Sequence, residues 1–183
     1  MTIFDRGVIV FDLLREALLP YYLYVKAIHL FFVAMWMWST AAAYAYYLVP
    51  VFKAWRRNPR DPGVLAMRNW AIERFDQGAT YEHIAFPAIL LTGPLLYFLA
   101  GWSTESGWLA LKLLIVLGVF LPIEILDYHL SHLGGNKRNV RRRNDPVAYE
   151  RAIHHHWLFL ILSSPVVMVF ILAVIALAVI KPF

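Results

Sequence analysis

Four long apolar stretches dominate the pattern of hydrophobic and polar positions along the chain. They cover roughly residues 21–50, 79–101, 107–130 and 157–180. Each is long enough to cross a hydrocarbon core of about 30 Å as a helix. Because a spanning segment must satisfy its own backbone polar groups, the pattern predicts an all-α membrane protein. We expect a single domain, residues 1–183, folded as a bundle of four transmembrane helices.

The first 19 residues do not fit the same pattern. Charged side chains interrupt their apolar background: Asp5, Arg6, Asp12, Arg15 and Glu16. A signal peptide needs an uninterrupted apolar region, so these charges argue against one. The segment instead predicts a short interfacial helix that ends near Pro20.

Composition supports the membrane assignment and excludes several kinds of site. Hydrophobic residues make up 61% of the chain, above the roughly 50% that is usual in soluble domains. There is no cysteine, which excludes disulfides and thiolate metal ligands. No motif of a hydrolase, a nucleotide-binding protein or a zinc protease occurs.

Basic residues are concentrated in two of the three connections between the apolar stretches. Residues 51–78 and 131–156 together hold twelve of the seventeen. They are Lys53, Arg56, Arg57, Arg60, Arg68, Arg74, Lys137, Arg138, Arg141, Arg142, Arg143 and Arg151. The positive-inside rule then places these connections in the cytoplasm. We expect a multi-pass protein of the bacterial inner membrane, with both termini extracytoplasmic. The basic connections should contact anionic lipid and no nucleic acid.

The first basic connection also contains a turn signal, at residues 58–63, followed by an amphipathic pattern. This pattern predicts a short separate helix at residues 64–75. No internal repeat is evident.

Lys112 and His29 are polar residues inside predicted membrane spans. An ionisable side chain in the membrane is a candidate functional group, since burying its charge is costly. Counting 1.5 Å per residue from the outer interface puts both at a similar depth, about 8–10 Å. Histidine is a common axial ligand of haem iron, and a neutral lysine amine can also bind iron. The alternatives are a hydrogen-bonded interior histidine and a lysine that reaches the interface.

A second group of polar residues is expected at the cytoplasmic ends of the last three spans. Its members are histidines and carboxylates: Glu82, His83, Glu124, Asp127, His132, His154, His155 and His156. Such side chains from several helices could hold an additional transition metal, or a second haem through His83. The alternative is ordinary polarity at the level of the lipid headgroups.

Three stretches together resemble the HemJ family of protoporphyrinogen IX oxidases, small four-helix membrane haem proteins. Residues 26–29 (KAIH), with Trp36 two turns later, resemble the opening helix of the family. Residues 107–113 (GWLALKL) are similar to the start of its third helix, and residues 180–183 (IKPF) to its C-terminus. The run PAILLTG at 87–93 fits the second helix.

The resemblance implies a function and a set of site residues. His29 and Lys112 would be the axial ligands of a haem b, and Trp36 an aromatic neighbour. The reaction would be oxidation of protoporphyrinogen IX, with electrons passed to membrane quinone.

A second hypothesis remains open. Residues 77–83 read QGATYEH where the family has a basic segment, and Ser163 and Ser164 replace an Asn-Glu pair. The chain could therefore be a non-catalytic haem-binding electron-transfer or accessory subunit of a larger membrane complex, or a homo-oligomer.

Overall fold

The structure is a computed structural model that describes the backbone of residues 3–102 and 106–182. Side chains are described from residue 10 onward within these ranges, apart from residues 39 and 40. The described residues form helices and connecting turns, with no strand. Four helical runs are long and apolar enough to cross a membrane. The prediction of an all-α protein with four such helices is confirmed.

The helices follow the predicted order along the chain. The first apolar stretch forms α2 (Tyr22–Ala43), η2 (Tyr44–Leu48) and α3 (Val49–Arg57), and the second forms α4 (Pro62–Ala100). The third forms α5 (Gly107–Ile115), η3 (Val116–Phe120) and α6 (Leu121–His132). A short α7 (Lys137–Arg142) leads to the last long helix, α8 (Pro146–Ile180).

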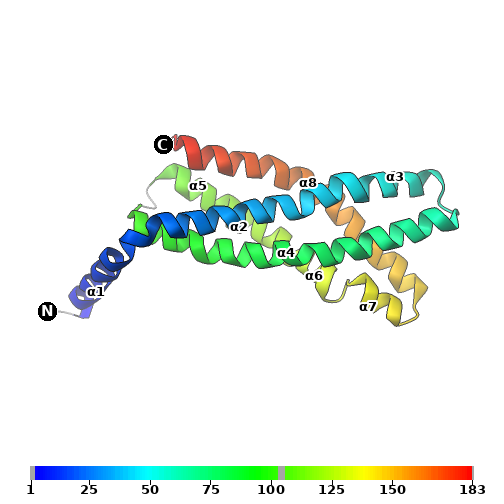
Figure 1. Cartoon of the computed structure of the whole chain (residues 1–183), viewed down its shortest axis with the longest axis horizontal. Coiled ribbons are helices and arrows are strands. Elements are labelled where there is room, and N and C mark those ends of the chain that lie inside the picture. Colours follow the sequence, from blue (N-terminus) through cyan, green and yellow to red (C-terminus); the bar gives the residue numbers. More distant parts are fainter. Residues whose placement is uncertain (1–2, 103–105, 183) are drawn as a thin grey trace.

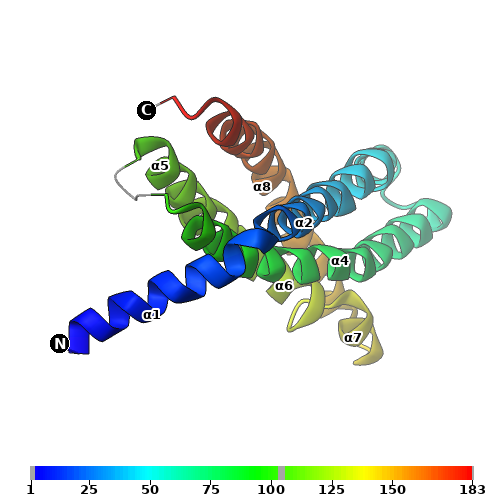
Figure 2. The ribbon, with the colours of Figure 1, turned by 60° about the vertical axis from the view of Figure 1, so that its left-hand side comes forward.

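The N-terminal segment is helical, as predicted, and forms α1 (Ile3–Leu18) followed by the 3₁₀ turn η1 (Leu19–Tyr21). Figures 1 and 2 show α1 projecting away from the bundle. Arg15 attaches the C-terminal part of α1 to α4, because the Arg15 Nε donates to the Leu99 carbonyl oxygen at 3.4 Å. A cation suits this position because carbonyl groups at a helix C-terminus carry partial negative charge.

The first basic connection is much shorter than predicted. The separate helix expected at residues 64–75 is part of the continuous α4, and only residues 58–61 lie between α3 and α4. Asp61 starts α4 by accepting a hydrogen bond from the Val64 amide at 2.9 Å, and Pro62 suits the first helical turn. The helix continues because Ile72 and Phe75 are buried on a face against other helices.

Two π-helical segments, η2 and η3, interrupt the first and third of the long helical runs. Each ends two residues before a proline: η2 before Pro50 and η3 before Pro122. A proline has no N–H to donate, so the carbonyl four residues earlier loses its partner and the turn widens. The five-residue turn inserts one residue into the helical repeat. The sequence pattern did not predict these segments.

The long helices lie side by side, and Figure 1 shows the two ends of the molecule clearly. One end holds α1, the start of α5 and the end of α8; the other holds α3, α7 and the start of α4. α2 packs along α4, and α6 contacts both α4 and α8. One buried cluster contains Trp36 and Trp108, and a second contains Phe52 and Trp157. We call the end of the molecule that holds α1 the α1 end, and the end that holds α7 the α7 end.

Candidate functional site

His29 lies on α2, half-buried against α4. Its Nδ1 is 2.8 Å from the hydroxyl of Thr92. That hydroxyl donates to the Ala88 carbonyl oxygen at 2.7 Å, so its single hydrogen is used. The Thr92 oxygen must then accept from His29 Nδ1, and the imidazole lone pair is left on Nε2. A histidine that binds a metal through Nε2 needs this tautomer.

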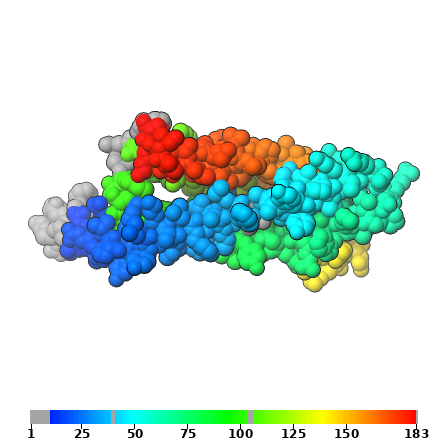
Figure 3. All heavy atoms as spheres, turned by 45° about the horizontal axis from the view of Figure 1, so that its top comes forward, coloured from blue at the N-terminus to red at the C-terminus, as the bar shows by residue number. Residues whose placement is uncertain are grey.

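Lys112 lies on α5 and is half-buried. The side chains of Lys112 and His29 are close enough for their charges to interact. The two residues are 83 positions apart in the sequence, and their binding of one cofactor stays a prediction. Figure 3 shows a furrow between α2 and α8 towards the α1 end of the molecule.

Segments that carry the family resemblance also meet at this end. The Lys181 ammonium lies 5.1 Å from the ring centre of Trp102 and 5.5 Å from that of Trp108. A cation over an indole face is attracted by the ring's electron density. Residues 107–113 and the end of α8 thus share one contact region.

Trp36 occupies the interior of the bundle, seven residues after His29 on the same helix. Its ring packs against Phe86 and Phe120, with ring centres 5.5 and 5.1 Å away. Its indole Nε1 donates to Glu124 Oε1 at 2.5 Å. The predicted aromatic neighbour of His29 is therefore also a hydrogen-bond donor to a buried carboxylate on α6.

The predicted polar group forms a buried network that begins at Glu124. Glu82 on α4 faces Glu124, and His83 Nε2 lies 4.0 Å from Glu124 Oε2. The same His83 nitrogen is 3.3 Å from Asp127 Oδ2. On the other side of the ring, His83 Nδ1 is 3.0 Å from His132 Nε2. His83 on α4 thus lies close to three residues of α6: Glu124, Asp127 and His132.

The network continues from Asp127 to α8 and α7. Asp127 Oδ1 is 3.0 Å from His156 Nε2, and His156 Nδ1 contacts the Lys137 amine. That amine is 2.9 Å from Asp76 Oδ1 and donates to the Leu130 carbonyl at 3.0 Å. Lys137 and His156 are fully buried, and Asp76 is 3% exposed. Asp76 thus pairs with both Lys137 and His156.

The predicted transition-metal centre finds no support in this arrangement. No group of three or more His, Asp or Glu side chains in the described ranges is placed to hold a metal ion. His83 meets His132 through one ring nitrogen and Asp127 through the other, so the donors do not converge on one point. His154 and His155 are exposed, because successive helical residues point about 100° apart and only His156 faces inward.

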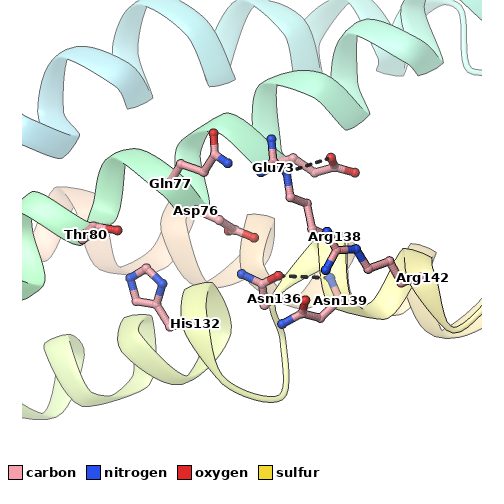
Figure 4. Close-up of a pocket in the computed structure, with 9 residues that line it drawn as sticks. All are labelled: Glu73, Asp76, Gln77, Thr80, His132, Asn136, Arg138, Asn139 and Arg142. Carbon is pink, nitrogen blue, oxygen red and sulfur yellow. Dashed lines mark hydrogen bonds and ion pairs between the residues drawn. The ribbon is translucent and has the colours of Figure 1, made fainter.

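A polar cavity of about 450 Å³ opens beside the network at the α7 end. Its lining residues are Glu73, Asp76, Gln77, Thr80, His132, Asn136, Arg138, Asn139 and Arg142. Figure 4 shows Asp76 on α4 and His132 on α6 both directed towards the space between these helices. Both residues also belong to the buried network. Because Arg138 and Asn139 of α7 line it, the cavity lies at the α7 end, whereas His29 is on the part of α2 near the α1 end.

Sequence reasoning missed Thr92, Asp76 and Lys137. Asp76 had a recognisable signal, since it shares a helix face with the apolar residues Ile72 and Ala79. Lys137 had none, because it begins a basic run and looks like the other solvated cations. Thr92 hydrogen-bonds along its own helix, as threonines in membrane helices often do.

The comparisons with known proteins returned no match. No family model, no curated protein and no solved structure is similar to this chain. The resemblance to the HemJ family stays a prediction from the residues quoted above.

Proposed function

We propose that this protein is a haem-b-binding membrane oxidoreductase of the HemJ type, which oxidises protoporphyrinogen IX and passes electrons to quinone. The main support is the pairing of His29 with Thr92. The hydrogen bond at Nδ1 fixes the ring and leaves Nε2 for an iron ion, while Lys112 from another helix is within electrostatic reach.

The residues around the pair suit such a cofactor. His29 and Lys112 would be the axial ligands, and Thr92 would hold the imidazole in its orientation. Trp36, Phe86 and Trp108 belong to an apolar cluster that would exclude water. A bound haem b would supply one-electron redox chemistry to the site.

The visible spectrum of the purified protein tests cofactor binding. We expect a Soret band in the wild type that is lost or shifted in His29→Ala and in Lys112→Ala. His155→Ala is the matched control, because His155 is exposed at the far end, and it should keep the wild-type spectrum. A colourless, iron-free wild-type protein would refute the proposal.

Catalysis is tested separately from cofactor binding. Protoporphyrin fluorescence should appear faster than by autoxidation when protoporphyrinogen IX is supplied to membranes containing the protein. Haem binding without this activity, together with failure to rescue an oxidase-deficient strain, would instead favour the accessory-subunit hypothesis.

The proposed membrane placement follows from the positions of charge. The α7 end holds the basic connections, so it should be cytoplasmic, and α1 should lie in the opposite interface. The exposed apolar residues Phe11 and Leu13 on α1 fit this location.

Because the chain has no cysteine, single cysteines report topology without background. Asn139→Cys should react with an impermeant maleimide only after the cells are opened. Ser106→Cys should react in intact spheroplasts. The opposite labelling pattern would reverse the proposed orientation.

A further inference from the structure

The buried polar network extends well away from the proposed haem site, and cofactor binding does not require it. Glu124 and Asp127 are each 5% exposed, Asp76 is 3% exposed, and Lys137 and His156 are fully buried. These side chains come from α4, α6, α7 and α8. Ionisable groups at such depth are costly, and in membrane proteins they commonly line ion or proton pathways.

The network has an entrance from solvent at the α7 end. Asp76 and His132 line the polar cavity and at the same time contact buried members of the network. Figure 4 shows these two side chains entering the space from facing helices. Water in the cavity can therefore reach two proton-exchanging groups directly.

Two branches lead from the cavity and meet at His83. The short branch is His132 to His83, with 3.0 Å between the ring nitrogens. The longer branch runs from Asp76 through Lys137 and His156 to Asp127, which is 3.3 Å from His83 Nε2. Both branches pass through the same imidazole, so His83 is the common step.

The inner end of the network is Glu124, deep between the helices. Trp36 from α2 donates to it, Glu82 and His83 face it from α4, and Asp127 adds a negative charge from its own helix. His83 Nε2 and Glu124 Oε2 are both buried and without a hydrogen bond in the described part of the chain.

We propose that these side chains form a proton-transfer path between the cavity at the α7 end and Glu124 in the interior of the bundle. An imidazole with a partner at each ring nitrogen can accept a proton on one side and release one from the other. The connected contacts at His132, His83 and Glu124 provide that arrangement.

The proton transfer at His83 needs no other reactant. As His132 gives up its Nε2 proton, an N–H bond forms at His83 Nδ1. The N–H bond at His83 Nε2 breaks and an O–H bond forms at Glu124. His83 Nε2 and Glu124 Oε2 are 4.0 Å apart, and a small side-chain rotation or one bridging water connects them for the transfer. Rotation of the imidazole ring then restores its starting state.

The path exists whether or not the protein binds haem, and only its use in oxidation rests on the proposed function. Trp36, at its inner end, is seven residues from His29, about 10 Å along α2. The inner end of the path therefore lies about two helical turns from the proposed haem ligand His29.

Infrared spectroscopy of the full-length protein in lipid nanodiscs tests the path directly. After rapid transfer from H₂O to D₂O, the carbonyl stretch of a protonated buried carboxyl group shifts as its proton exchanges. We expect such a band from Glu124 in the wild type, lost or shifted in Glu124→Gln, because this carboxyl group is 5% exposed and burial disfavours its charged form. In His83→Gln, which retains hydrogen bonding but cannot relay protons, exchange should slow by on the order of a hundredfold.

Two further variants keep the test decisive. His132→Gln lies at the cavity edge, where it is least disruptive to folding, and should slow exchange by a smaller factor because the second branch remains. His155→Gln, an exposed neighbour of His156, should exchange at the wild-type rate. Wild-type exchange rates in both His83→Gln and His132→Gln would overturn the proposal, as would the absence of a band sensitive to Glu124→Gln. Both infrared results are independent of haem binding, because a loss of haem is detected in the visible spectrum.

Discussion

At the scale of single residues, the decisive information lies in what each polar side chain contacts. The sequence was sufficient to select His29 and Lys112 as candidates, because ionisable residues in apolar helices are conspicuous, whereas Trp36 was selected through the family resemblance. It could not assign Thr92 as the partner of His29, since these residues are 63 positions apart and threonine is unremarkable in such helices. Partners of this kind depend on how helices pack.

Replacing Thr92 tests its role in holding the imidazole. Thr92→Val keeps the shape of the side chain but removes the oxygen that accepts from His29 Nδ1. We expect haem affinity to fall by about 10–100-fold, the usual effect of losing such a supporting contact. Haem titration of the apoprotein measures it. Thr92→Ser retains the oxygen and should bind nearly as the wild type does; equal affinity in the valine variant would contradict the assignment.

Trp36→Phe tests the hydrogen bond to Glu124 while leaving an aromatic ring in the core. Glu124 loses its indole donor, which should lower the free energy of unfolding by about 1–3 kcal/mol. Thermal denaturation in detergent measures the change. Trp38→Phe is the control, because Trp38 is 80% exposed and its replacement should leave the melting temperature unchanged. Similar melting temperatures in both variants would argue against this contact.

At the scale of helices, the spans were predictable from hydropathy but their internal register was not. Lys112 and Glu124 are twelve residues apart, which in a regular helix separates them by about 120°. The extra residue in η3 reduces this to about 20°, so both face the interior. Interior positions on the third span accordingly include Ile115, Phe120 and Glu124, with a spacing of five inside η3 and four after it. A helical period of 3.6 residues applied to the sequence therefore assigns the residues after a π-helical turn to the wrong face of the helix.

Single-residue deletions test the extra residue in η3. Deleting Leu117 should convert η3 to a regular turn and keep Lys112 and Glu124 on one face. Deleting Leu126 should rotate every later residue of α6 by about 100° and disrupt folding. Leu117 and Leu126 are 52% and 54% exposed, so neither deletion removes core volume. The yield of monodisperse protein in size-exclusion chromatography compares them; equal yields would count against the register argument.

At the scale of the whole molecule, the buried pair of Lys137 and Asp76 attaches α7 to α4. Lys137→Met leaves Asp76 buried without its cation, which should cost about 3–5 kcal/mol. The double variant Lys137→Met, Asp76→Leu removes both charges and should recover a large part of that loss. Chemical denaturation in mixed micelles measures both. Additive losses in the double variant would show that the two residues do not act as a pair.

The four-helix arrangement was predictable because each apolar stretch has the length of a membrane span. The attachment of α7 was not, because Lys137 stands among cations that are exposed, such as Arg141 and Arg142. Its burial follows from the turn at residues 133–136, which places the start of α7 between α4 and α8.

The length of α4 has a practical consequence for imaging this small protein. Its residues before the predicted span, 62–78, extend about 25 Å at 1.5 Å per residue. Together with α7 and the first turns of α8 they form a protrusion fixed by the Lys137–Asp76 contact. In electron micrographs of nanodisc-embedded particles, this protrusion would break the featureless profile of the disc. An antibody fragment raised against it would serve as a rigid marker for particle alignment.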